Sequence, residues 1–139
     1  MTRRPDEILL VDDHVPTIRL VTELLETAFP GLAFVSARTA VEAIAFCAAS
    51  LPRLVIMDIG LPDINGIDAT RTIKAMSGTV SIVMHSNHDH DVYRRESAAA
   101  GGDAFVSKSQ THADLVSTIA GLLDISPLRR ATDRKGQET

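Results

Sequence analysis

Leu54-Val55-Ile56-Met57-Asp58 is the stretch that decides the fold. Four consecutive bulky apolar residues, two of them β-branched, are typical of a strand that is buried on both faces, and the run ends on a carboxylate. A loop rich in residues that interrupt regular backbone follows at once, with Gly60, Pro62, Asn65 and Gly66. The sequence therefore places Asp58 at the carboxyl end of a buried strand, which is the edge of an open α/β sheet where ligands bind.

Four further apolar runs predict strands over residues 8–11, 32–35, 81–85 and 104–106. Helical patterns separate them over 14–29, 39–50, about 65–76, about 89–100 and about 111–123. Capping residues set the expected helix starts, and these are Thr39, Asn65 or Asp63, Asp89, and Thr111 or Ser109. Because parallel strands need crossover connections, five strands alternating with five helices predict an α/β fold, with a parallel sheet covered by helices on both faces.

Length and composition limit the possible function classes. A chain of 139 residues suits one domain, which we expect over 1–125, and residues 126–139 lack apolar periodicity and are expected to form a flexible tail or linker. The net charge of -4 gives no basic surplus for DNA contact by these residues. No apolar run reaches the roughly 18 residues of a membrane span, and no export signal is readable, so a cytoplasmic location is expected. Because Cys47 is the single cysteine, an intrachain disulfide is excluded, and we expect Cys47 to be a small buried apolar residue of the core.

Polar or charged side chains that could take part in a reaction follow four of the predicted strands. If the strand ends lie side by side, then Asp12, Asp13, Asp58, Ser86 and Lys108 share one edge of the sheet. Adjacent carboxylates repel one another, so the acidic trio favours a hard cation such as Mg²⁺ among its oxygens. Asp58 would act as a carboxylate nucleophile toward a phosphoryl group, while Lys108 and Ser86 would contact the phosphoryl oxygens.

These motifs together resemble the receiver domain of two-component response regulators. The matching segments are Leu10-Val11-Asp12-Asp13-His14, the stretch from Met57 through Gly66, Ser86, and the stretch from Ala100 through Lys108. The resemblance runs from about residue 8 to residue 123. It implies a flavodoxin-like (βα)5 fold, a doubly wound five-stranded sheet with strand order 2-1-3-4-5.

The resemblance also implies roles for individual residues. Asp58 would accept a phosphoryl group from a sensor histidine kinase, a phosphotransfer protein or a small phosphodonor. Asp13, Asp58 and the backbone carbonyl of Gly60 would hold Mg²⁺, with Asp12 acting through water. The implied protein is a signalling phosphoacceptor that catalyses its own phosphorylation and dephosphorylation rather than an enzyme acting on a separate substrate.

The resemblance assigns the switch to two residues. Ser86 would be the switch hydroxyl and Phe105 the switch aromatic. Phosphorylation would draw Ser86 toward the phosphate and turn Phe105 inward, reshaping the face of the fourth helix, fifth strand and fifth helix for an output partner or a dimer.

Several positions depart from the usual receiver pattern. Ser109 follows Lys108 where proline is common, which makes a cis peptide less favourable there. Gly60 is small for the second position after the phosphoacceptor and, with His88, predicts an altered phosphoryl lifetime. His85, His88 and His90 are interpreted as hydrophilic loop residues rather than as a metal cluster.

Two other function classes compete with the phosphoacceptor. An FMN-binding electron carrier lacks support, because no phosphate-binding loop follows the first strand and Asp12-Asp13 would repel the flavin phosphate. A pseudo-receiver, an interaction module not controlled by phosphorylation, conflicts with the intact site. The motifs look like those of regulators with a C-terminal helix-turn-helix, so the chain is read either as a stand-alone receiver or as part of a longer DNA-binding regulator.

Overall fold

A computed structural model describes residues 2–128 and contains one five-stranded parallel sheet over that range. The strands are β1 (Arg3–Val11), β2 (Ala33–Ala37), β3 (Leu51–Met57), β4 (Ser81–Ser86) and β5 (Ala104–Ser107). The helices are α1 (Val15–Ala28), α2 (Ala40–Ala49), α3 (Gly66–Met76), α4 (Asp91–Ala99) and α5 (Thr111–Leu123), with a 3-10 turn η1 (Lys108–Gln110) before α5. The order β2-β1-β3-β4-β5 confirms the fold class and the strand order that the resemblance implied.

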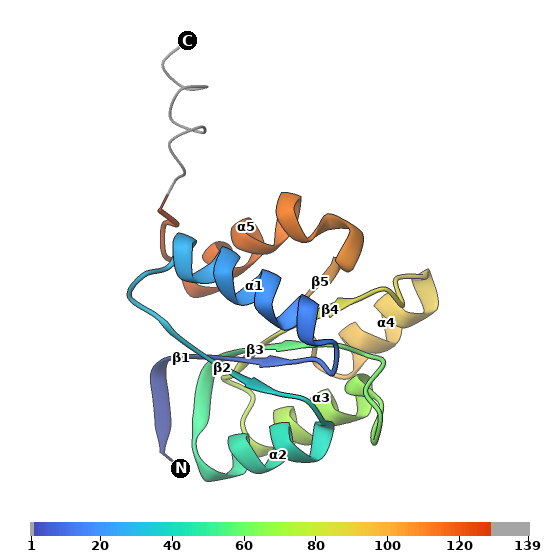
Figure 1. The fold of residues 1–139 in the computed structure, drawn as a ribbon. Coiled ribbons are helices and arrows are strands. Elements are labelled where there is room, and N and C mark those ends of the chain that lie inside the picture. The colour runs from blue at the N-terminus through green and yellow to red at the C-terminus, as the bar shows by residue number, and fades with distance from the viewer. Residues whose placement is uncertain (1, 129–139) are drawn as a thin grey trace.

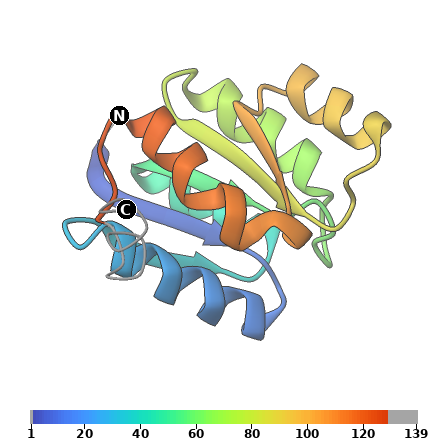
Figure 2. The same ribbon diagram turned by 90° about the horizontal axis from the view of Figure 1, so that it is seen from above.

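Helices cover both faces of the sheet, as Figures 1 and 2 show. Helices α1 and α5 lie on one face, and α2, α3 and α4 lie on the other. Side chains alternate along each strand, so Leu54 and Ile56 of β3 pack toward α1 and α5 whereas Val55 and Met57 pack toward α2 and α3. Burial of the central strand on both faces explains its continuous apolar run.

The strands extend beyond their predicted bounds. β1 begins at Arg3 rather than at Ile8, because Arg3 and Arg4 pair with the start of β3, and a register irregularity separates this pairing from that of Ile8 onward. β4 includes Ser86, which pairs with Ser107 of β5. Backbone pairing therefore continues where the apolar sequence pattern ends.

Of the helix caps predicted from the sequence, those of α2 and α3 are confirmed and those of α4 and α5 are not. Thr39 accepts a hydrogen bond from the backbone N–H of Glu42, and Asn65 accepts one from Ile67 at 2.7 Å. The caps predicted for α4 and α5 are wrong. His90 and Gln110 occupy those positions without side-chain caps, because the predicted capping side chains bond to other elements.

Past α5, the chain contacts the last residue of α1. Asp124 adopts a left-handed conformation with φ of 54°, and the Leu128 N–H donates to the Ala28 carbonyl at 2.8 Å. The division into a domain and a tail stays a prediction, because most of the expected tail lies outside the described residues.

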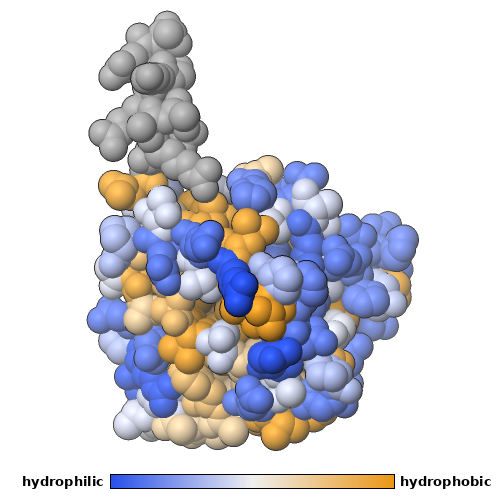
Figure 3. Space-filling view, in the orientation of Figure 1, coloured by the Kyte–Doolittle hydropathy of each residue, from blue (hydrophilic) through white to orange (hydrophobic). Residues whose placement is uncertain are grey.

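No helix within residues 2–128 is long and apolar enough to cross a membrane. Apolar patches on the face in Figure 3 lie between hydrophilic residues.

Candidate functional site

Backbone hydrogen bonds to neighbouring strands hold Asp12 and Asp58, the residues that directly follow β1 and β3. The Asp12 N–H donates to the Ala37 carbonyl at 3.1 Å, and the Asp58 N–H donates to the Val11 carbonyl at 3.0 Å. Lys108 follows the last residue of β5 and opens η1. Because the three strands are parallel, these side chains meet at one edge of the sheet.

One lysine and three carboxylates form the centre of the site. Lys108 Nζ lies 2.9 Å from Asp12 Oδ2 and 3.1 Å from Asp58 Oδ2. Carboxylate oxygens of Asp12, Asp13 and Asp58 lie within 4.8 Å of one another. Asp12 is fully buried, Asp58 is 6 % exposed, and Asp13 is exposed. The structure thus brings these four predicted site residues together.

The charges at this edge do not balance. Burial raises the pKa of Asp12, and the nearby Asp58 charge adds to the rise, while Lys108 and the His14 N–H oppose it. Burial lowers the pKa of Lys108, but its pairing with Asp12 and the charges of Asp58 and Asp12 outweigh this effect and raise the pKa. Lys108 therefore stays protonated. One ammonium facing three carboxylates leaves an excess of negative charge, which fits a bound cation.

The two oxygens of Asp12 have separate partners. Oδ2 pairs with Lys108, and Oδ1 accepts a hydrogen bond from the His14 N–H at 2.9 Å. Both carboxylate oxygens of Asp12 therefore have partners within the protein, whereas Asp13 is exposed. This placement fits the indirect, water-mediated role expected for Asp12.

Ser86 ends β4 and Phe105 lies in β5, the two strands that follow β3 in the sheet order. The fully buried Ser86 accepts a hydrogen bond at Oγ from the His88 N–H at 3.2 Å. Phe105 is half-buried, and the Arg94 guanidinium of α4 lies 4.5 Å above its ring centroid. Both predicted switch residues therefore contact α4 or the loop that precedes it.

Gly60 also faces that loop. A side-chain Cβ at this position would lie 3.1 Å from the His88 imidazole, which is itself exposed and in contact with the Tyr93 ring. The imidazole of His88 thus stands where a larger residue at position 60 would project.

The interpretation of the histidines needs one correction. His85 lies in β4, within the predicted strand over 81–85, so its interpretation as a hydrophilic loop residue is wrong, and only 1 % of it is exposed. Burial lowers its pKa to about 4, with the Lys108 charge adding to the effect and Asp58 opposing it. Among residues 2–128, the one cluster with metal-ligand spacing is the aspartate trio.

Sequence reasoning missed how the loop after Asp58 is anchored. Asp63 does not cap α3. Its two oxygens accept hydrogen bonds from the Ala40 and Val41 N–H groups at the start of α2, both at 2.9 Å. These bonds lower the pKa of Asp63. The loop that carries Gly60 is therefore tied to a neighbouring helix.

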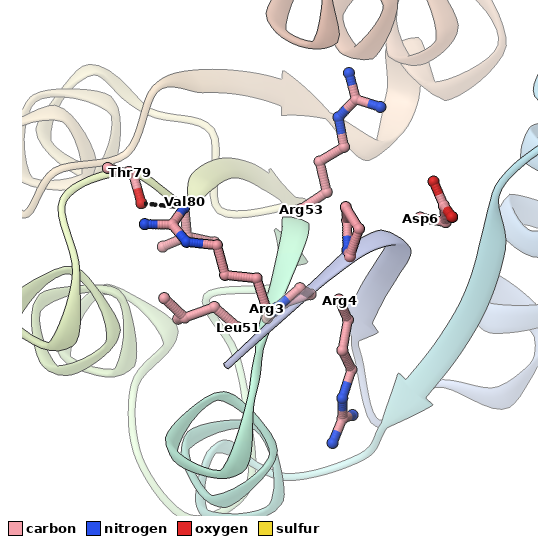
Figure 4. Close-up of a pocket in the computed structure, with 9 residues that line it drawn as sticks. Arg3, Arg4, Asp6, Leu51, Arg53, Thr79 and Val80 are labelled. Atoms are coloured by element: carbon pink, nitrogen blue, oxygen red, sulfur yellow. Dashed lines mark hydrogen bonds between the residues drawn. The ribbon is translucent and has the colours of Figure 1, made fainter. Parts of the chain in front are cut away.

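A pocket of about 240 Å³ lies at the opposite edge of the sheet and is lined by Arg3, Arg4 and Arg53. Figure 4 shows the three guanidinium groups pointing away from one another. Arg3 bonds to Thr79, Arg4 stacks on Phe46, and Arg53 donates to the Leu123 carbonyl. This pocket lacks the convergent donors of an anion site and plays no part in the chemistry above.

Comparisons with known proteins agree with this geometry. The family model described as the response regulator receiver domain matches residues 8–120. The chain is 34% identical to the transcriptional activator protein ExaE of Pseudomonas putida over 84% of this chain and 54% of that protein. It is 30% identical to the chemotaxis protein CheY of Halobacterium salinarum over 84% of this chain and 96% of that protein.

Solved structures give the same match. A two-component response regulator of the LuxR family from Aurantimonas sp. SI85-9A1 superimposes with a TM-score of 0.76 at 34% identity, covering 87% of this chain and 86% of that one. A CheY-like receiver domain protein from Methanospirillum hungatei JF-1 gives a TM-score of 0.79 at 27% identity, covering 87% and 95%. The chain spans about half the length of the first curated relatives that it matches.

Proposed function

This chain belongs to the response regulator receiver family of two-component signalling, and on that premise we propose that Asp58 is its phosphoacceptor. The observation that carries the proposal is the contact of Lys108 Nζ with the Asp58 carboxylate at 3.1 Å, within a cluster of three carboxylates. Asp58 directly follows the central strand β3, and its N–H donates to the Val11 carbonyl at 3.0 Å, so its position is set by pairing with β1.

The proposed reaction is phosphoryl transfer to a carboxylate. An Asp58 oxygen forms a bond to phosphorus, while the bond between phosphorus and the donor group breaks and its electron pair leaves with the donor. Lys108 then pairs with a phosphoryl oxygen in place of the free carboxylate, and Ser86 donates its hydroxyl to another oxygen. Hydrolysis of the acyl phosphate returns the carboxylate and completes a self-catalysed cycle.

Mg²⁺ is the proposed cofactor. Asp13, Asp58 and the Gly60 carbonyl would hold it, with Asp12 acting through water. The trio fits such an ion because it places carboxylate oxygens within 4.8 Å of one another with one ammonium against them. When bound, the ion would neutralise charge on the phosphoryl oxygens. The residues of the chain orient the nucleophile and contact the phosphoryl group.

The proposed switch begins at Ser86. Its oxygen now accepts from the His88 N–H, so movement of that oxygen toward a phosphoryl group would pull on the loop before α4. Phe105 stacks against Arg94 of α4, and turning the ring inward would break that contact. The face of α4, β5 and α5 is the proposed surface for an output partner or dimer.

The wider setting is also a proposal. This chain would act in the cytoplasm, where a sensor histidine kinase or phosphotransfer protein would donate the phosphoryl group. Two of the matched relatives are named as a transcriptional activator and a LuxR-family regulator. Because the chain spans about half of such curated relatives, a DNA-binding output in a longer protein and a stand-alone signalling role are both compatible with it.

The test is intact mass spectrometry after incubation with Mg²⁺ and acetyl phosphate. We expect a phosphoryl adduct on the wild type and none on Asp58→Asn. Asp114→Asn is the matched control, because Asp114 is an exposed residue in the first turn of α5. It should gain the adduct as the wild type does. Absence of any adduct on the wild type, with acetyl phosphate and with a histidine kinase donor, would support the pseudo-receiver alternative.

A further inference from the structure

His85 is a buried polar residue that the proposed chemistry does not use. It lies in β4 immediately before Ser86, and its ring is enclosed on the side of the sheet covered by α5. Nε2 lies 2.7 Å from Thr111 Oγ1, whereas Nδ1 is buried without a hydrogen-bond partner. An apolar side chain would fill this place without the cost of a buried, unpaired Nδ1. The bond from Nε2 to Thr111 is the one polar contact that a histidine gains here over an apolar residue.

The direction of that bond follows from its neighbour. Thr111 Oγ1 lies 2.8 Å from the Lys108 carbonyl oxygen, which can only accept, so the Thr111 hydroxyl donates its single proton there. Thr111 Oγ1 must then accept from His85, which puts the ring proton on Nε2. The result is a directed chain from the His85 N–H through the Thr111 O–H to the Lys108 carbonyl. In such a chain each hydrogen bond strengthens the next.

We propose that His85 is a positioning residue for Lys108, acting through Thr111 to hold the turn from which the Lys108 ammonium reaches Asp58. The inference rests on the proposed function, in which Lys108 contacts the phosphoryl group. These hydrogen bonds would link β4 to the end of β5. Ser86 and Ser107 are paired in the sheet, and the bonds through Thr111 join His85, before Ser86, to Lys108, after Ser107.

The arrangement also accounts for how this chain holds the Lys108 turn without a proline. Ser109 follows Lys108, and the peptide bonds of the described residues are all trans. Ser107 caps one side of η1 through its bond from the Ser109 N–H at 3.4 Å, a weak contact. The two hydrogen bonds that run from His85 through Thr111 to the Lys108 carbonyl are shorter, and they restrain the other side of the turn.

Four variants separate positioning from simple packing. His85→Met keeps a similar volume and removes the donor, while His85→Gln keeps an amide N–H at about the reach of Nε2. Thr111→Val removes the hydroxyl, and Thr111→Ser keeps it. We expect His85→Met and Thr111→Val to slow phosphorylation of Asp58 by acetyl phosphate about tenfold, the worth of one buried hydrogen bond, and the Gln and Ser variants to retain the wild-type rate within about threefold.

The decisive comparison repeats His85→Met in a Lys108→Ala background. If His85 acts through Lys108, its substitution should cause no further loss of rate once the lysine side chain is gone. An equal loss in both backgrounds would overturn the proposal, because it would show that His85 only supports the fold.

A second readout does not depend on phosphorylation. The Lys108 carbonyl ¹³C shift should move in His85→Met toward its value in Thr111→Val, and the wild-type imidazole should carry its proton on Nε2 by ¹⁵N NMR. An unchanged carbonyl shift or the other tautomer would overturn the inference. If the wild type accepts no phosphoryl group but these shifts behave as expected, the proposed function fails and the positioning link stands.

Discussion

The two helices that flank β5 differ in how they are held. α5 buries Leu115, Ile119 and Leu123 against the sheet, and its first residue, Thr111, is tied to β4 through His85. α4 buries a single residue of its own, Ser97.

Polar contacts near its start connect α4 to β5 instead. Asp89 accepts a hydrogen bond from the Ser107 hydroxyl at 2.7 Å, and Arg94 stacks on Phe105. Apolar burial resists displacement over a whole helix, whereas two polar contacts can exchange partners. The difference suggests that α5 holds Lys108 in place while α4 is the element that can respond.

The largest difference should appear in stability. Leu115→Ala in α5 removes a fully buried side chain and should lower the free energy of unfolding by about 2–5 kcal/mol. Val92→Ala in α4 removes a side chain that is 47 % exposed and should change it by less than about 0.5 kcal/mol. Urea denaturation measures both values, and equal losses would remove the contrast between the helices.

Acidification should weaken the α5 side through His85. Its folded-state pKa of about 4 lies below the ordinary 6.5, so the unfolded chain binds more protons between these values. Stability is therefore fully present above pH 6.5 and is lost as the pH falls toward 4, by about 3 kcal/mol in total.

His85→Gln cannot titrate and serves as the control for this effect. The difference in unfolding free energy between wild type and variant should change with pH across that window. A difference that is independent of pH would mean that the wild-type ring is not kept neutral by burial.

The α4 side should respond to loss of its polar anchor without global unfolding. The Ser107 hydroxyl lowers the pKa of Asp89, so this contribution is lost only as the pH falls below the ordinary carboxylate range. Asp89→Ala should raise the hydrogen-exchange rates of α4 amides and leave those of α5 unchanged. Asp114→Ala, in the first turn of α5, is the control and should not affect α4. Faster exchange in both helices after Asp89→Ala would contradict a local anchor.

The smallest predicted effect concerns the contact between the site and the loop before α4. Gly60→Met should displace the exposed His88 imidazole, since even a Cβ would lie 3.1 Å from it. Water access to an acyl phosphate on Asp58 would change with it, so the dephosphorylation rate should differ from that of the wild type. Gly31→Met, at a position with open space around it, is the control. Equal dephosphorylation rates for Gly60→Met and the wild type would exclude this role.

The sequence predicted the sheet and the acidic cluster well because both depend on local patterns. Apolar runs mark buried strands, and a carboxylate or lysine directly after a parallel strand must lie at one edge of the sheet. The alternation of strands and helices then left few possible folds. Strand order came from the resemblance rather than from the pattern, and the structure agrees with it.

The errors arose where a polar side chain had a distant partner. Asp89 and Thr111 have good capping chemistry, but Asp89 bonds to β5 and Thr111 links His85 with Lys108. Asp63 caps a helix, although not the one that follows it. His85 lies within the predicted strand but is also interpreted as a loop residue with the polar residues that follow it, whereas strand pairing continues through Ser86. Such contacts depend on tertiary placement, which local sequence does not encode.

The central claim is that Asp58 carries the phosphoryl group. The most direct measurement is to treat the wild type with acetyl phosphate and Mg²⁺, reduce the acyl phosphate with borohydride, and locate the reduced residue by tandem mass spectrometry. We predict that the modified residue is Asp58 and that Lys108→Ala lowers its yield. Modification of Asp12 or Asp13 with Asp58 unchanged would contradict the claim.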